Sequence, residues 1–415
     1  MNRDDEYSFM QETIKDEQLG PKKVLAKAFK WVGLGIVFGA AACLSFYALK
    51  PWAENTFREE PEEVELSNDD EINEPEEPVV EVPEAEPEQE VEKQELTLDD
   101  YYILNNELKQ VADKVQKSVV EVSGIAETSD WAAEGNGILG STSGLIVADN
   151  GRELLILSNY SSTKSTKIYQ VEFVDGTVHQ ASLKQVDANL DMAVYSVAKD
   201  GISETTWGNI AIAELGNSNL LGQGRTVIAV GQPFGYDDGV GYGIASTLSE
   251  TIVRADGEYQ IIVTDVAYVS AGNGFLFDIY GKAMGYIDSS LGKGTLVAYG
   301  ISDIMAEIEL MSNGKYVPYA GILGTMVTQE TSELYEIPVG LYVTEVEAES
   351  PAMNAGIQNG DIITAIAGRE ITSLDVYHEA LYELEPGHSV KFEGQRYGTE
   401  EYVDMDFTVA IGIKE

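Results

Sequence analysis

Apolar residues between positions 118 and 301 occur in short runs, and Gly, Asp, Asn and Ser separate the runs. Examples are "SGLIVADNGRELLILS", "DMAVYSV" and "TVIAVG". Runs rich in Val, Ile, Leu and Tyr with turn residues between them are typical of β-strands. Since little helical periodicity interrupts them, the pattern predicts an all-β barrel or a pair of sandwiches.

Two segments flanking this β region follow the helical period instead. The first, 98–116, has acidic residues in its first turn and this apolar face: Leu104, Leu108, Val111 and Val115. The second, 302–313, has Ser302 as a candidate N-cap and Gly314 as its end. We therefore predict a β domain over 98–301, which includes the first helix, and a linker helix within 302–317.

The pattern becomes mixed α and β over 318–412. Strands are predicted in "GLYVTEV", "GDIITAIAG", "HSVKFEG" and "YVDMDFTVAI", and a helix in "SLDVYHEALYEL". Ser350 and Pro351 open a one-turn helix that Gly356 ends. The expected fold is therefore mainly β, with a smaller α+β domain at the C-terminal end.

Residues 31–49, "WVGLGIVFGAAACLSFYAL", are uncharged and long enough to cross a bilayer at about 1.5 Å per residue. Lysines precede this stretch and acidic residues follow it, so the positive-inside rule places 1–30 in the cytoplasm. The sequence predicts a single-pass protein of the cell membrane whose remaining chain is extracytoplasmic. Two alternatives stay open: a cleaved signal peptide, and a lipid attached to Cys43.

Acidic residues and prolines dominate 50–97, which predicts an extended, disordered and solvated linker. Calcium binding is an alternative there, although no fixed ligand spacing supports a metal site. The net charge of −45 argues against nucleic acid as a partner, because phosphate binding needs clustered Lys and Arg. Cys43 is the only cysteine, so no internal disulfide is expected.

Residues 100–412 resemble the HtrA-type envelope proteases. The resemblance rests on "SGLIVADNG", "VEFVDGTVHQASLKQVDANLDMAVYSV", "AVGQPFG" and "VTDVAY", in the order of that family, followed by "SPAMNAGIQNGDIITAIAG". It implies a membrane anchor, a trypsin-like double β-barrel and then a PDZ domain. It also implies assembly into an oligomer, in this family often a trimer.

Serine-type acyl transfer needs a nucleophile, a base and a group that orients the base. The resemblance places the base position at Ser161 in "ILSNYSST", the orienting acid at Asp191 and the nucleophile position at Asn273 in "VSAGNGFLF". Serine is no base near neutral pH, and asparagine lacks a nucleophilic oxygen of the required kind. The loop before Asn273 is also one residue shorter than the family's loop, which would disturb an oxyanion site.

Other residues could replace the lost groups only if the alignment is misplaced. Ser270 lies three residues before Asn273, and the sequence has three histidines: His179, His378 and His388. His179 matches a strand, whereas the other two fall in the α+β domain. A serine with a lysine base is a further chemistry, but the candidate lysines have no recognisable dyad spacing: Lys164, Lys167 and Lys282.

In the PDZ-like part, the resemblance implies a carboxylate-binding loop at Tyr319, Ala320, Gly321 and Ile322. Such a loop points backbone N–H groups at the terminal carboxylate of a peptide. Tyr377 and Leu381, on the predicted helix 374–384, are candidates to line the side-chain pocket. The alternative is that they only form the core face of that helix.

The resulting hypothesis is a membrane-anchored pseudoprotease that binds protein C-termini or unfolded segments and acts as a scaffold, chaperone or regulator in envelope protein quality control. Two alternatives remain: an active serine endopeptidase of that family, and a structural tether that binds no peptide. No cofactor and no metal are expected under any of them.

Overall fold

The computed structural model describes residues 62–66, 97–126, 137–292 and 294–414. None of the helices in these ranges has the length and apolar character needed to span a bilayer. The predicted membrane segment 31–49 and most of the predicted linker 50–97 lie outside the described residues.

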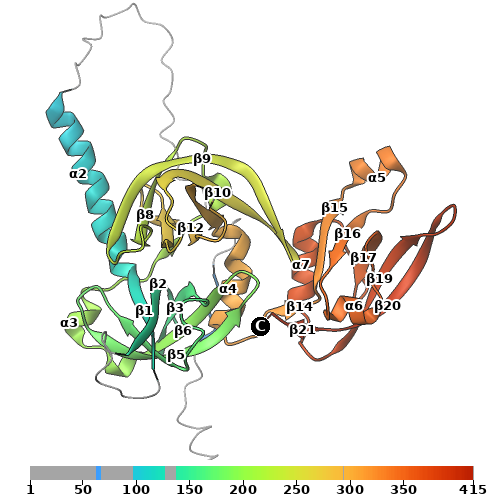
Figure 1. The fold of residues 1–415 in the computed structure, drawn as a ribbon, viewed down its shortest axis with the longest axis horizontal. Coiled ribbons are helices and arrows are strands. Elements are labelled where there is room, and N and C mark those ends of the chain that lie inside the picture. The colour runs from blue at the N-terminus through green and yellow to red at the C-terminus, as the bar shows by residue number, and fades with distance from the viewer. Residues whose placement is uncertain (1–61, 67–96, 127–136, 293, 415) are drawn as a thin grey trace, which may run out of the picture. The chain divides into compact units, whose positions relative to one another are not determined.

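The first half of the β domain is a closed barrel with strand order β1-β2-β3-β6-β5-β4 (Figure 1). Every neighbouring pair is antiparallel. Its strands are β1 (Val119–Ile125), β2 (Ile138–Asp149), β3 (Glu153–Asn159), β4 (Ile168–Glu172), β5 (Val178–Asp187) and β6 (Met192–Ala198). The apolar positions of these strands fill the barrel, including Val122, Ile156, Tyr169 and Tyr195.

The second half is a seven-stranded sheet with the order β11-β8-β9-β10-β13-β12-β7, and β11 also pairs with β12, which closes six of its strands into a ring. The strands are β7 (Glu214–Leu215), β8 (Thr226–Gln232), β9 (Gly239–Arg254), β10 (Gly257–Ala267), β11 (Asn273–Phe277), β12 (Lys282–Asp288) and β13 (Thr295–Gly300). Leu157 of the first half and Phe275 of the second belong to one buried cluster, so the two halves share a core. This arrangement is the expected double barrel.

Helix α2 (Leu98–Val115) begins at Thr97, whose side chain forms a capping box with Asp100. Helix α4 (Met305–Ser312) follows a 3-10 turn, Ser302–Ile304. The predicted N-cap role of Ser302 is wrong, because its hydroxyl accepts a hydrogen bond from the N–H of Ser218 instead. Shorter helical turns in the β domain are Gln116–Ser118, Lys199–Gly201, Glu204–Trp207 (α3) and Ser218–Leu220.

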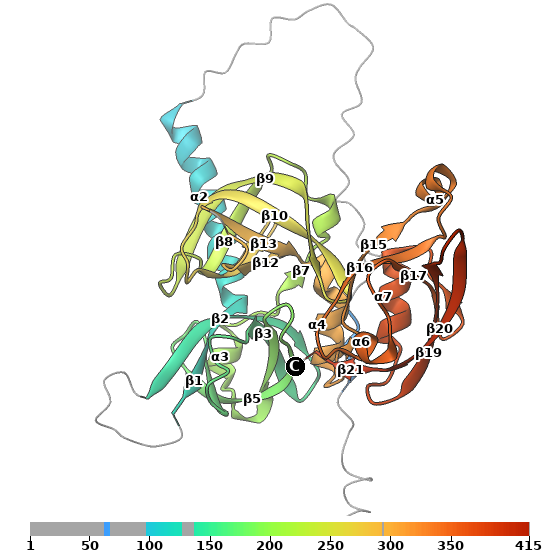
Figure 2. The same ribbon diagram turned by 45° about the vertical axis from the view of Figure 1, so that its right-hand side comes forward.

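The C-terminal domain has one sheet in the order β15-β16-β17-β19-β20, with helices packed beside it (Figure 2). Its strands are β15 (Ile322–Val327), β16 (Gly340–Val346), β17 (Asp361–Ile366), β18 (Arg369–Glu370), β19 (Ser389–Tyr397) and β20 (Tyr402–Ala410), and its helices are α5 (Gln329–Tyr335), α6 (Pro351–Ala355) and α7 (Leu374–Tyr382). The first and last strands of the domain, β14 (Pro318–Tyr319) and β21 (Gly412–Ile413), form a separate antiparallel pair. Ser350 caps α6 and Gly356 ends it, as expected.

The structure corrects the predicted linker at residues 62–66, which are not solvated throughout. Val64 is buried in the core that the two barrel halves share. Its N–H donates to Oδ1 of Asn313 at 2.8 Å, and Nδ2 of Asn313 donates back to its carbonyl at 2.9 Å. Val64 is therefore buried within an acidic stretch, because Asn313 at the end of α4 supplies both of its hydrogen-bond partners, and Leu66 packs against the same core.

Candidate functional site

Ser161 and Asp191, predicted as the positions of base and orienting acid, lie side by side. The Ser161 hydroxyl donates to Oδ2 of Asp191 at 2.7 Å, and its N–H donates to Oδ1 at 2.6 Å. The carbonyl of Asp191 accepts from the N–H of Tyr160 at 3.0 Å and from the hydroxyl of Tyr286 at 2.8 Å. Asp191 also has a positive φ of 53°, which Asp tolerates better than most residues. Asp191 accepts all of these hydrogen bonds. It therefore connects the loop that follows β3 to β6, the strand that begins at the next residue.

Asn273 opens β11 and is only 9% exposed. Its Oδ1 accepts from the N–H of Ser143 at 2.8 Å, while its Nδ2 donates to Oε1 of Gln232 at 3.2 Å and to the carbonyl of Ala271 at 3.3 Å. Within the described residues, no hydrogen bond joins Asn273 to Ser161 or Asp191. The structure thus brings the last two together and holds Asn273 in a separate set of contacts with β2 and β8.

The turn before Asn273 is tight. The N–H of Gly272 donates to the carbonyl of Val269 at 2.8 Å. Gly274 has a φ of +130°, and a Cβ there would lie 2.3 Å from the carbonyl oxygen of Val230. Backbone packs against backbone at this point, so the turn leaves little freedom for a side chain to swing out as a nucleophile.

The other candidate groups do not assemble a site. Ser270 is exposed in the turn. His179 lies in β5 beside Phe173, His388 lies in the turn before β19, and neither hydrogen-bonds to a serine in the described part of the chain. Lys164 and Lys167 are exposed, and Lys282 pairs with Glu214 at 3.3 Å.

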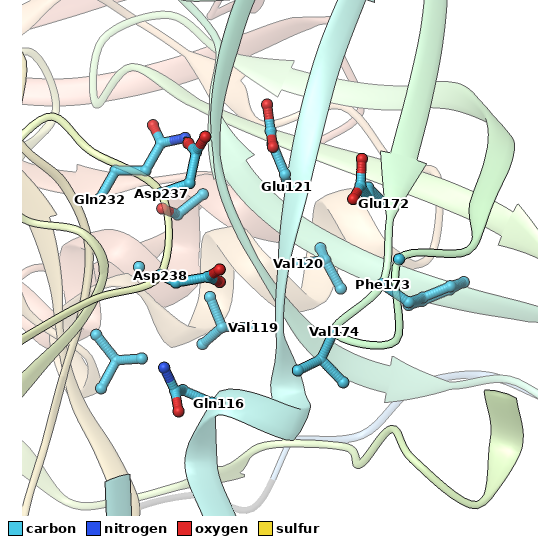
Figure 3. A pocket seen from close by; sticks show the side chains of 14 residues that line it. Gln116, Val119, Val120, Glu121, Glu172, Phe173, Val174, Gln232, Asp237 and Asp238 are labelled. Atoms are coloured by element: carbon cyan, nitrogen blue, oxygen red, sulfur yellow. The ribbon is translucent and has the colours of Figure 1, made fainter. Parts of the chain in front are cut away.

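Ser143 and Gln232, two of the hydrogen-bond partners of Asn273, also line a cavity of about 250 Å³ (Figure 3). The wall includes four carboxylate residues and neither Lys nor Arg: Glu121, Glu172, Asp237 and Asp238. Burial raises the pKa of the Glu121 carboxyl, and the nearby carboxylates add to the rise. Such a wall repels anions and attracts cationic side chains. Sequence reasoning missed it, although the acidic pair 237–238 after "GQPFGY" was a visible signal.

In the C-terminal domain, the predicted carboxylate-binding loop has three N–H groups that converge on one point. The amides of Ala320 and Gly321 each donate at 2.8 Å, and that of Ile322 at 3.1 Å. The acceptor is the side chain of Asp256, which lies in the β9–β10 turn and which sequence reasoning did not single out. Gly321 has a φ of +84°, and a Cβ there would lie 2.3 Å from Cβ of Ser350, so only glycine fits.

The two predicted pocket residues lie on α7, and both are fully buried. The hydroxyl of Tyr377 donates to Oδ1 of Asp256 at 2.8 Å, so this side chain faces the same point as the loop amides. Leu381 belongs to the core of the domain. Tyr319 differs from its neighbours in the loop, because its hydroxyl donates to Glu347.

The sequence-family comparisons divide the chain in the same way as the fold. Residues 142–285 match the trypsin-like peptidase domain and residues 321–407 match the PDZ domain. The fold and these matches define a trypsin-like peptidase domain followed by a PDZ domain. Curated relatives and solved structures indicate which group of peptidases has this combination of domains.

Curated relatives include the "Serine protease Do-like HtrA" of Lactobacillus helveticus, 29% identical over 67% of this chain and 71% of that protein. The protein of the same name in Bacillus subtilis is 28% identical over 63% of this chain and 62% of its own length. A "Probable periplasmic serine endoprotease DegP-like" of Pseudomonas putida is 30% identical, and the match spans only 55% of it. Several relatives are therefore matched over less than two thirds of their length.

Among solved structures, the HtrA-type protease AlgW with decapeptide has a TM-score of 0.50 at 20% identity, over 74% of this chain and 98% of that one. AlgW with tripeptide gives 0.50 at 21% identity, over 74% and 97%. At this identity the likeness concerns the fold alone. The two domain matches and the curated relatives support an HtrA-type protease.

Proposed function

We propose that this chain is a catalytically inactive HtrA-like protein that binds C-termini or extended segments of other proteins through its PDZ domain. The observation that carries the proposal is Asn273, which stands at the nucleophile position with its amide held by hydrogen bonds to Ser143, Gln232 and Ala271. Neither atom of that amide is placed or suited to attack a carbonyl.

The second support is the pairing of Ser161 with Asp191. In an active triad, the acid orients an imidazole that takes the proton of the nucleophile. Here the acid instead accepts hydrogen bonds from the hydroxyl and the N–H of Ser161. A serine hydroxyl in the place of the imidazole cannot act as a base near neutral pH.

The PDZ part supports a binding role. Backbone N–H groups that converge on one carboxylate are the arrangement that captures a peptide C-terminus, and the peptide then adds as a strand to an open sheet edge. Ala320, Gly321 and Ile322 supply such groups, and Tyr377 adds a hydroxyl donor. We include Tyr319 as the first residue of this loop and Leu381 as a lining residue of the neighbouring pocket.

We further propose that residues 31–49 anchor the chain in the cell membrane, with 1–30 cytoplasmic and the two domains extracytoplasmic. The name "periplasmic" given to the relative in Pseudomonas putida supports an envelope location. Assembly into a trimer, as in the family, and a scaffold or regulatory role in envelope protein quality control belong to the same proposal.

The experiment that tests inactivity uses the full chain in detergent. It is incubated with a fluorophosphonate and, separately, with an unfolded protein substrate, beside the relative from Bacillus subtilis as positive control. We expect neither labelling nor turnover. Turnover that disappears in Ser161→Ala or Ser270→Ala would overturn the proposal, because it would identify a working serine. Turnover that survives both changes indicates a contaminating protease.

A further inference from the structure

The carboxylate-binding loop of the PDZ domain already holds a carboxylate, and that carboxylate belongs to the same chain. Oδ2 of Asp256 accepts from the amides of Ala320 and Gly321, both at 2.8 Å, and Oδ1 accepts from Ile322 at 3.1 Å. The hydroxyl of Tyr377 completes the set at 2.8 Å. Asp256 is 1% exposed, so water has almost no access to this carboxylate.

The main chain of Asp256 also occupies the place of a ligand. Its N–H donates to the carbonyl of Ile322, the first residue of β15, at 2.7 Å. A bound peptide uses the same two kinds of contact: its terminal carboxylate enters the loop, and its backbone pairs with the adjoining strand. Asp256 reproduces both with one residue.

The hairpin that carries Asp256 is held against the groove helix. Tyr259, three residues later in β10, stacks on the ring of His378 of α7 with centroids 6.2 Å apart. On its other side, the carbonyl of Ala255 accepts from Nδ2 of Asn189 at 3.2 Å. Asp256 itself has a φ of 60°, the left-handed conformation that lets the turn present its side chain to the loop.

The carboxylate of Asp256 is stabilised by hydrogen bonds rather than by a positive charge. Among the described residues no Lys or Arg pairs with it, so the four N–H and O–H donors alone stabilise the carboxylate. A buried carboxylate without hydrogen bonds destabilises the folded state, so the loop and the aspartate stabilise each other. The same donors cannot serve a peptide C-terminus while Asp256 is in place.

We propose that Asp256 is an internal ligand of the PDZ domain, and that a protein C-terminus with a free carboxylate binds only by displacing the β9–β10 turn from the loop. This inference rests on the peptide-binding role proposed above. A tethered competitor acts at an effective concentration in the millimolar range, and the apparent Kd rises in inverse proportion to the fraction of molecules with a free loop. The partners able to compete with Asp256 are C-termini with a low intrinsic Kd for the loop, or several C-termini presented together on an aggregated protein.

Two variants of the full chain test the proposal. Asp256→Gly removes the carboxylate and keeps the left-handed turn, because glycine adopts a positive φ without strain. Asp256→Asn keeps the size but removes the charge. The matched control is Asp238→Gly, an exposed aspartate with a φ of 56° that has no hydrogen bond to the PDZ domain in the described part of the chain.

The first measurement is amide hydrogen exchange of the fragment that covers 319–322. We expect exchange there to be at least ten-fold faster in Asp256→Gly than in the wild type, with Asp256→Asn between them. The strand β17 and the Asp238→Gly control should stay unchanged. Equal protection of the loop in the wild type and in Asp256→Gly would overturn the proposal.

The second measurement is binding to an array of decapeptides with varied C-terminal residues, each made as the free acid and as the amide. We expect Asp256→Gly to bind the best free acids with a Kd at least ten-fold lower than the wild type, and to discriminate against the amides. Equal Kd values for wild type and variant would overturn the proposal. If the loop opens in the exchange experiment but no peptide binds any variant, Asp256 is still the internal ligand, and it is the proposed peptide-binding function that fails.

Discussion

At the scale of single residues, Asn273, the proposed nucleophile position, makes structural contacts in three directions. Its side chain joins β2, β8 and the turn before β11. Sequence comparison could identify the substitution, but it could not reveal these partners. Ser143 and Gln232 are 130 and 41 residues away in the sequence. Gln232 reaches Asn273 because β8 pairs with β11 in the second half, and Ser143 reaches it because β2 of the first barrel packs against that half.

We expect Asn273→Ala to lower the free energy of unfolding by about 1–3 kcal/mol, because the buried N–H of Ser143 and Oε1 of Gln232 lose their partner. Urea unfolding followed by fluorescence measures the change. Asn106→Ala, an exposed site on α2, is the control and should stay within about 0.5 kcal/mol of wild type. An Asn273→Ala protein as stable as the control would contradict the structural role assigned here.

Asp187 is fully buried, and its Oδ2 has no hydrogen-bond partner among the described residues. Burial raises the pKa of this carboxyl to about 6; Lys414 opposes the rise and Glu307 adds to it. Since the ordinary value is near 3.9, the folded state holds the proton more tightly than the unfolded state. The contribution of Asp187 to stability is therefore greatest below about pH 4 and is lost as the pH rises through 6.

Asp187→Asn should remove this loss, because the amide stays neutral and its oxygen can still accept from the N–H groups of Asn189 and Leu190. We expect the variant to gain stability relative to wild type between pH 4.5 and 7, by on the order of 2 kcal/mol, since one pKa unit corresponds to about 1.4 kcal/mol. Urea unfolding across this pH range measures the difference. A constant difference at every pH would contradict the raised pKa.

At the scale of elements, periodicity predicted the helices and strands well where local signals were strong. The acidic first turn of α2, the residues that open and end α6 and the turn residues between strands are local signals, and the sequence alone predicts them. The contacts of 62–66 were not, because they depend on Asn313 and Glu309, which lie more than two hundred residues away. The role of Asp256 could not be predicted for the same reason. Its partners in the loop lie 64 to 66 residues away, and an Asp-Gly pair in a hairpin turn is common.

The docked segment 62–66 gives a prediction of its own. Val64→Ala removes two methyl groups from a buried site, so we expect it to lower the free energy of unfolding by about 1–2 kcal/mol. Val174→Ala, at a side chain that is 48% exposed, is the matched control and should change it by less than about 0.5 kcal/mol. Chemical unfolding of the full chain compares the two. Equal effects would mean that Val64 leaves the core in solution.

At the scale of the whole molecule, Glu307 links elements that belong to both folded domains. It is fully buried on α4, and its Oε1 accepts from Tyr259 of β10 at 2.9 Å and from Tyr382 of α7 at 2.6 Å. One carboxylate oxygen thus holds a tyrosine of the peptidase-like domain and a tyrosine of the PDZ domain. The contact lies beside the turn that carries Asp256, so the two should act together in holding the hairpin against α7.

Glu307→Ala removes the acceptor that the two tyrosine hydroxyls share, whereas Glu307→Gln keeps an acceptor oxygen for them. We expect Glu307→Ala to uncouple the domains: calorimetry of the full chain should show two separate transitions, and exchange at 319–322 should rise as it does in Asp256→Gly. Glu307→Gln should resemble the wild type, because the bonds to Tyr259 and Tyr382 need an acceptor rather than a charge. If Glu307→Ala melts in the same way as Glu307→Gln and its loop stays protected, then Asp256 alone holds the PDZ domain to the hairpin, and Glu307 has no part in coupling the domains.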